Sequence, residues 1–72
     1  MYKILIIDDE TLIRKSVSKL IETNLPECAP PEEARSAAEG IEKVNLLNPD
    51  IIITDICMND MTGLDMLKKL NT

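Results

Sequence analysis

Three acidic residues, Asp8, Asp9 and Asp55, are the side chains of this sequence best placed to do chemistry. Residues 4 to 7, ILII, run directly into Asp8 and Asp9, and residues 51 to 54, IIIT, run into Asp55. Apolar runs of this length, rich in β-branched residues, are typical of strands buried on both faces of a parallel sheet. If the two strands are neighbours, their acids meet at the carboxyl edge of the sheet, where open α/β sheets bind ligands.

A cluster of carboxylates at this edge favours a bound cation. Neighbouring strands lie about 4.8 Å apart, and two carboxylates about 4 Å apart repel by about 4 kcal/mol at an effective dielectric constant of about 20. The sequence contains no histidine, and Cys28 and Cys57 form no CxxC motif, which argues against zinc. Oxygen ligands indicate Mg²⁺, Mn²⁺ or Ca²⁺. Because Mg²⁺ pairs carboxylates with phosphate oxygens, we expect phosphoryl chemistry with a carboxylate nucleophile.

Two alternatives to this interpretation stay open. The acids at positions 8 to 10 could simply favour the start of the following helix, where the helix dipole attracts negative charge. A Mg²⁺-dependent phosphohydrolase with an aspartyl nucleophile would use similar acids, but Asp55 is followed by Ile56 and Cys57, so the second acid of a DxD motif is absent.

Composition limits the other function classes. The chain has 72 residues, enough for one domain at most, and a formal net charge of -5. This charge argues against a nucleic-acid surface in this segment. No apolar run approaches the length of a membrane span or a signal peptide. We interpret both cysteines as reduced thiols and expect a cytoplasmic protein.

Hydrophobic periodicity predicts alternating strands and helices, and hence parallel strand pairing through right-handed crossovers. The predicted elements are strands over residues 3–7, 33–36 and 51–54, and helices over residues 12–23, 37–47 and from 64 onward. The strand over 33–36 has a poor strand composition and is expected at the sheet edge. Thr11 is the predicted N-cap of the first helix. Gly40 should weaken the second helix by about 1 kcal/mol relative to alanine.

The first helix carries an apolar stripe that should face the sheet. The stripe consists of Leu12, Ile13, Val17, Leu20 and Ile21. Arg14 is expected on the opposite, solvent-facing side of the helix.

Three stretches, KILIIDDE, AAEGIEKVNLLNPD and IIITDICMNDMTG, resemble the receiver domain of two-component response regulators. The resemblance extends from Tyr2 to Leu70, with the motifs in the family's order and spacing. It implies an α/β, flavodoxin-like β-α-β-α-β-α unit whose three parallel strands have the order 2-1-3.

The resemblance also implies roles for individual residues. Asp55 matches the family's phosphoacceptor. Asp8 and Asp9 match the acidic pair that holds Mg²⁺, together with Asp55 and the backbone carbonyl of Cys57. Gly63 matches the glycine that closes the loop after the third strand.

Met58 and Met61 match methionine positions of the family in the same loop, where we expect them to pack as hydrophobic residues. Asn59 departs from the family, which usually has proline at this position.

The second departure is length. A complete receiver domain continues into two further strands and two helices, which supply a Ser or Thr and a Lys that contact the phosphoryl group. Residues 1–72 are therefore expected to be a partial receiver domain. Its third strand would be an apolar edge, which favours a homodimer or higher oligomer through that edge or through a bare sheet face.

The resemblance implies a regulatory phosphoacceptor rather than an enzyme, with Mg²⁺ as cofactor and a sensor histidine kinase as partner. The pairing of YKILIIDDE with TLIRK resembles receivers attached to helix-turn-helix transcription factors, which implies an output domain that binds DNA. The alternative is a receiver fragment that acts as a structural or oligomerising unit without phosphotransfer.

Overall fold

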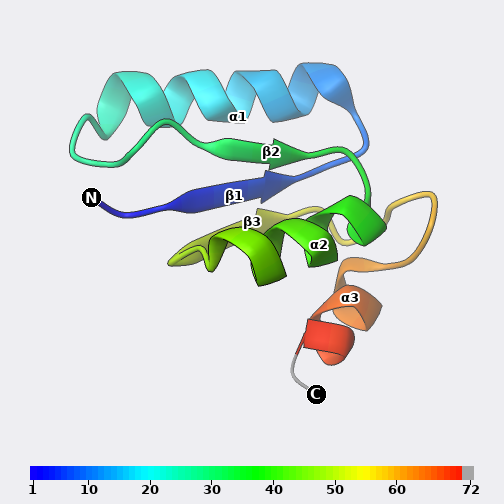
Figure 1. Ribbon diagram of the computed structural model, residues 1–72. Helices are drawn as coiled ribbons and strands as arrows, with labels where there is room; N and C mark the ends of the chain where they lie inside the picture. Colours follow the sequence, from blue (N-terminus) through cyan, green and yellow to red (C-terminus); the bar gives the residue numbers. More distant parts are fainter. Residues whose placement is uncertain (71–72) are drawn as a thin grey trace.

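The computed structural model describes residues 1–70 as a three-stranded parallel sheet with helices on both faces (Figure 1). The elements in chain order are β1 (Ile4–Ile7), α1 (Thr11–Asn24), β2 (Glu32–Ala34), α2 (Ala37–Leu47), β3 (Ile51–Thr54) and α3 (Gly63–Leu70). The strand order is β2-β1-β3. The predicted flavodoxin-like fold and the order 2-1-3 are therefore confirmed.

Strand β1 forms the centre of the core, and all four of its residues are buried. Leu5 and Ile7 point to one face, where they join a cluster with Ala37 of α2 and Met66 of α3. Ile4 and Ile6 point to the other face and pack with Ile21 of α1. A strand covered on both faces must be apolar throughout, which explains the continuous run in the sequence.

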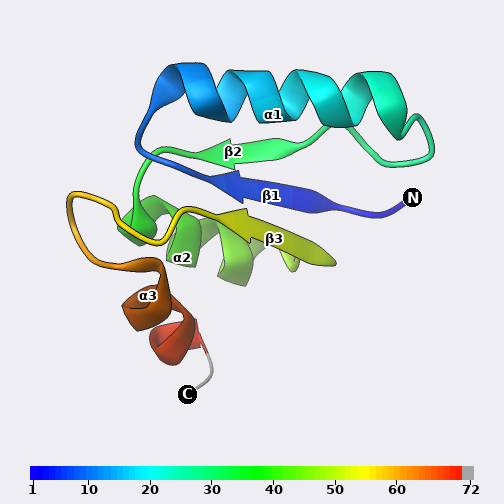
Figure 2. The same ribbon diagram turned by 180° about the vertical axis from the view of Figure 1, so that it is seen from behind.

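Strand β3 does not share the double burial that its apolar run suggested, but it forms the apolar sheet edge that was expected. Its pairing with β1 places Ile51 beside Ile4 and Ile53 beside Ile6, on the face that α1 covers. Ile51 is nevertheless 45% exposed and Ile53 39% exposed. The reason is visible in Figures 1 and 2, where α1 runs on the β2 side of the sheet and β3 lies at the opposite edge.

The sheet-facing side of α1 also differs from the predicted stripe. Leu12 is 83% exposed and Leu20 62% exposed, whereas Arg14, Ser18 and Ile21 are buried. Only part of the stripe therefore faces the sheet. Arg14 occupies the sheet-facing side of α1 in its place, and its guanidinium contacts Glu33 of β2. The N-cap of α1 is Glu10 rather than Thr11, and no side chain caps the helix there.

Helix α2 begins where predicted, and its N-cap explains why β2 is shorter than expected. Ser36, placed by prediction in the strand, instead accepts a hydrogen bond at its Oγ from the backbone N–H of Glu39 (3.1 Å). Gly40 lets the helix approach the sheet closely, because a Cβ atom there would lie 2.7 Å from Cδ1 of Ile7. The close packing of α2 on β1 explains a glycine that helix propensity alone disfavours.

Helix α3 ends the described chain, and Met66 enters the core from it, whereas Leu64 is exposed. No helix in residues 1–70 combines the length and apolar character needed to cross a bilayer.

Candidate metal and phosphoacceptor site

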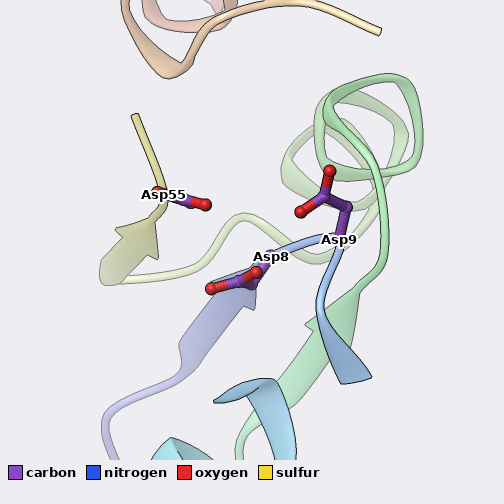
Figure 3. A group of neighbouring side chains, drawn as sticks. All are labelled: Asp8, Asp9 and Asp55. Carbon is purple, nitrogen blue, oxygen red and sulfur yellow. The ribbon is translucent and has the colours of Figure 1, made fainter. Parts of the chain in front are cut away.

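Three carboxylates gather at the carboxyl edge of the sheet (Figure 3). Asp8 and Asp9 follow β1 directly, and Asp55 follows β3. Parallel pairing aligns the two strand ends, and the backbone N–H of Asp55 donates to the carbonyl of Ile7 (3.1 Å). One carboxylate oxygen from each acid lies within 4.8 Å of the others. The predicted adjacency of the two strands therefore brings these side chains together.

Asp8 is the most buried of the three acids, with 8% of its surface exposed. Its Oδ1 accepts a hydrogen bond from the backbone N–H of Glu10 (2.9 Å), and its backbone carbonyl accepts one from Nη1 of Arg14 (2.9 Å). Its own N–H donates to the carbonyl of Ala34 on β2 (3.1 Å). These bonds fix both the backbone and the side chain of Asp8 without using all of its carboxylate lone pairs.

Asp9 and Asp55 are each held by one backbone N–H group from the β3–α3 segment. Asn59 donates to Oδ2 of Asp9 (3.1 Å), and Ile56 donates to Oδ1 of Asp55 (2.8 Å). The contact from Asn59 requires a backbone N–H group. Proline, which receiver domains usually have at this position, has no such group and could not make the contact.

Asp60 anchors the same loop to α2, a role that the sequence did not reveal. Its two carboxylate oxygens accept hydrogen bonds from the N–H groups of Ala37 (3.1 Å) and Ala38 (2.8 Å). These two hydrogen bonds lower the pKa of the Asp60 carboxyl below its usual value, and the bond from Ala38 has the larger effect. The aspartate type is a suitable helix cap, but the helix it caps lies more than 20 positions earlier in the chain.

Gly63 permits the loop to close against the acid cluster. Its N–H donates to the carbonyl of Ile56 (2.6 Å). A Cβ atom at this position would overlap the backbone carbonyl oxygen of Asp55. The close approach of two backbones accounts for a glycine at this position.

A charged group behind the cluster links α1 to β2. Nε of Arg14 donates to Oε1 of Glu33 (2.9 Å), and Nζ of Lys15 donates to Oε2 of the same carboxylate (3.1 Å). Burial acts to raise the pKa of Glu33, but the hydrogen bonds and charges of Lys15 and Arg14 outweigh it and lower the pKa. Glu33 therefore stays ionised beside the turn that carries Asp8.

The remaining predicted positions lie in the same loop. Cys57 is exposed, carries a free thiol and pairs with Thr62 in an isolated antiparallel bridge. The role of its backbone carbonyl stays a prediction. Met58 and Met61 are partly buried against the core, in agreement with a packing role.

The donor set fits a hard divalent cation. Three carboxylates from two adjacent strand ends supply only oxygen ligands, and the sequence contains no histidine. Mg²⁺ accepts such a set and retains several water molecules. The carboxylate oxygens lie within 4.8 Å of one another, and they have lone pairs that the hydrogen bonds described above do not use. They are therefore suited to bind one cation together.

The comparisons with known proteins agree with the fold. The sequence matches the response regulator receiver domain over residues 4–72. It is 40% identical over 67 residues to the nitrate/nitrite response regulator protein NarL of Escherichia coli, covering 93% of this chain and 31% of NarL. It is 39% identical over 69 residues to a protein-glutamate methylesterase/protein-glutamine glutaminase of Pseudoalteromonas atlantica, covering 96% of this chain and 18% of that protein.

A solved structure extends the agreement to three dimensions. The chemotaxis response regulator CheY4 of Vibrio cholerae superimposes with a TM-score of 0.88 at 30% sequence identity, covering 100% of this chain and 57% of CheY4. The chain thus spans less than a third of the two curated relatives named above and slightly more than half of this solved structure. The strand order, the sequence match and this superposition show that the chain belongs to the response regulator receiver domain family.

Proposed function

We propose that this chain is a phosphoacceptor unit of a two-component response regulator, in which Asp55 receives a phosphoryl group. Asp8, Asp9, Asp55 and the backbone carbonyl of Cys57 would hold Mg²⁺. The observation that carries the proposal is the meeting of three carboxylates within 4.8 Å at the carboxyl edge of the sheet. Such a cluster is costly without a cation, and its position is where α/β sheets bind ligands.

The side chain of Asp55 is arranged to act as a nucleophile. The N–H of Ile56 holds Oδ1, which fixes the carboxylate plane and leaves Oδ2 to attack the phosphorus atom of a donor. The new bond joins Oδ2 to phosphorus as the bond from phosphorus to the donor breaks, and the donor leaves with that electron pair. Mg²⁺, when bound, supplies positive charge that offsets the negative charge of the acids and of the phosphoryl group.

The partners follow from this chemistry and from the relatives. A sensor histidine kinase would present a phosphohistidine as donor, and an output domain would respond to the phosphorylated state. The likeness to the transcriptional regulatory protein YdfI of Bacillus subtilis supports an output domain that acts in transcription, for which we propose DNA binding. The net charge of -5 opposes direct nucleic-acid contact by this segment. We place the protein in the cytoplasm and treat residues 1–72 as a partial receiver domain with a regulatory rather than an enzymatic role.

A second candidate function is assembly through a second copy of this chain. The outer edge of β3 pairs with no strand in residues 1–70, and Ile51 and Ile53 are exposed beside it. An apolar edge of this kind favours association. Sedimentation velocity over a range of concentrations tests this candidate: dimer formation that Ile53→Glu abolishes supports it, and a monomer at all concentrations contradicts it.

The experiment that tests the phosphoacceptor function is intact mass spectrometry after incubation with acetyl phosphate. A single phosphate adduct is expected in the presence of Mg²⁺, and it should disappear with excess EDTA and in Asp55→Asn. Glu22→Gln, which removes an exposed acid of α1 far along the helix, is the matched control and should be phosphorylated normally. Folded protein that forms no adduct would contradict the proposal.

A further inference from the structure

Arg14 is a buried charged residue that the chemistry above does not use. Only 9% of its surface is exposed, although it lies on a helix whose apolar residues Leu12 and Leu20 face solvent. Burying a charge is unfavourable unless it is paired and hydrogen-bonded. The position of Arg14 at the core side of α1 therefore requires a structural or functional reason.

The contacts of Arg14 connect three separate elements. Its Nη1 donates to the backbone carbonyl of Asp8 (2.9 Å), and its Nε donates to Oε1 of Glu33 on β2 (2.9 Å). Lys15 holds the other oxygen of Glu33 (3.1 Å). The guanidinium fork is thus fixed at one nitrogen by a carboxylate and directs another nitrogen at the turn after β1.

The carbonyl that Arg14 holds belongs to the peptide between Asp8 and Asp9. A peptide unit is planar, so fixing its oxygen also fixes the direction in which the backbone leaves toward Asp9. This one plane joins the two acids that come from the β1 edge of the cluster. A rotation of the plane would move their carboxylates relative to each other and to Asp55.

We infer that Arg14 is a positioning residue for the cation site, and that it sets the relative placement of Asp8 and Asp9 through their shared peptide. This inference rests on the proposed function, because it concerns the same Mg²⁺ site. Arg14 contacts Glu33 and the carbonyl of Asp8, and it would not itself be a ligand of the cation. Its contribution is geometric, and Glu33 contributes by fixing the guanidinium.

Arg14→Lys tests this inference because lysine keeps the charge but cannot hold Asp8 and Glu33 in a rigid fork. Mn²⁺ serves as the probe, since the electron paramagnetic resonance signal of free Mn²⁺ reports binding without any reaction. Arg14→Lys should raise the Kd for Mn²⁺ about 10-fold, the lower end of effects seen for groups that orient metal ligands. The folded fraction is measured in parallel by circular dichroism and used to correct the Kd.

Two control variants separate positioning from general stability. Lys15→Ala removes a contact to Glu33 but none to Asp8, and Ile21→Val loosens the packing of α1 on the sheet. Both should leave the Kd of the folded protein within about 2-fold of the wild-type value, because neither removes a bond to the acid pair. Equal loss of affinity in Ile21→Val and Arg14→Lys would overturn the inference.

A second variant keeps the test decisive if Arg14→Lys does not fold. Glu33→Gln leaves Arg14 in place and exchanges its charged acceptor for a neutral one, which should raise the Kd about 3-fold because neutral hydrogen bonds are weaker. An unchanged Kd in the folded variants would overturn the inference alone. Wild-type protein that takes up no Mn²⁺ would overturn the proposed cation site as well, so the two failures are distinguishable.

Discussion

Replacing Asp9 by asparagine should stabilise the metal-free protein while it abolishes Mg²⁺ binding. The three carboxylates lie within 4.8 Å of one another, and at that distance two unit charges repel by about 0.9 kcal/mol in bulk water and about 3.5 kcal/mol at an effective dielectric constant of about 20. Asp9→Asn removes two of these repulsions. Asp9, the residue that is changed, and Asp55 are only partly buried, so the water value is the closer one, and about half of it is lost to screening at physiological salt.

The expected gain in unfolding free energy is therefore about 1 kcal/mol in EDTA. The asparagine carbonyl can still accept the hydrogen bond from the N–H of Asn59 that Asp9 accepts now, so little of the gain is offset. Saturating Mg²⁺ should stabilise the wild-type protein and leave the variant unchanged, because only the wild type binds the ion.

Urea unfolding followed by circular dichroism, with and without Mg²⁺, measures both effects. Glu22→Gln removes the same formal charge from an exposed site of α1 outside the acid cluster, and it should change the unfolding free energy by less than about 0.5 kcal/mol. The electrostatic reasoning would be refuted if Asp9→Asn were less stable than the wild type in EDTA, or no more stable than Glu22→Gln.

Three further predictions concern the loop between β3 and α3. Gly63→Ala should destabilise the fold by about 1–3 kcal/mol in urea unfolding, because its methyl group meets the backbone carbonyl of Asp55; unchanged stability would contradict the close approach. Asn59→Pro removes the N–H that holds Asp9, whereas Asn59→Ala keeps it, so only the proline variant should shift the carboxyl ¹³C resonance of Asp9. Asp60 has a pKa below its usual 3.8, so its contribution to stability is complete above that value and is lost as the pH falls through the lower folded pKa. Asp60→Asn should reduce the pH dependence of the unfolding free energy below about pH 4. An unchanged slope there would contradict a stabilising role of the ionised Asp60.

The sequence predicted the sheet and the meeting of the acids because both depend on strong local signals. A continuous apolar run that ends in acids identifies a buried parallel strand and its carboxyl end. Helices between such strands then fix parallel pairing. Asp8, Asp9 and Asp55 follow such runs directly, which places each of them at the carboxyl edge of the sheet. That β1 and β3 are neighbours was implied by the family resemblance, and their pairing brings the acids together.

The features that the sequence did not predict depend on partners far away in the chain. Hydrophobic periodicity assigns Leu12 and Leu20 to the core side of α1, but Arg14 occupies that side because Glu33 of β2 and the carbonyl of Asp8 satisfy its charge. Asp60 caps a helix that precedes it by more than 20 residues. Such pairings appear only once the elements are packed.

The apolar run of β3 on its own suggested burial on both faces, whereas the exposed edge of this strand was expected only from the family resemblance. An apolar strand has the same sequence whether it is covered on one face or on two. The rotation and position of α1 decide the outcome, because that helix lies toward β2 and leaves Ile51 and Ile53 uncovered among residues 1–70.

Mapping the phosphoryl group to a single residue tests the phosphoacceptor role of Asp55 most directly. Borohydride reduces an aspartyl phosphate to homoserine, which tandem mass spectrometry locates in the digested chain. After incubation with acetyl phosphate and Mg²⁺, we expect homoserine at position 55 and unmodified aspartate at positions 8 and 9. Homoserine at position 8 or 9, or at no position in protein shown to be folded, would contradict the assignment of Asp55 as the phosphoacceptor.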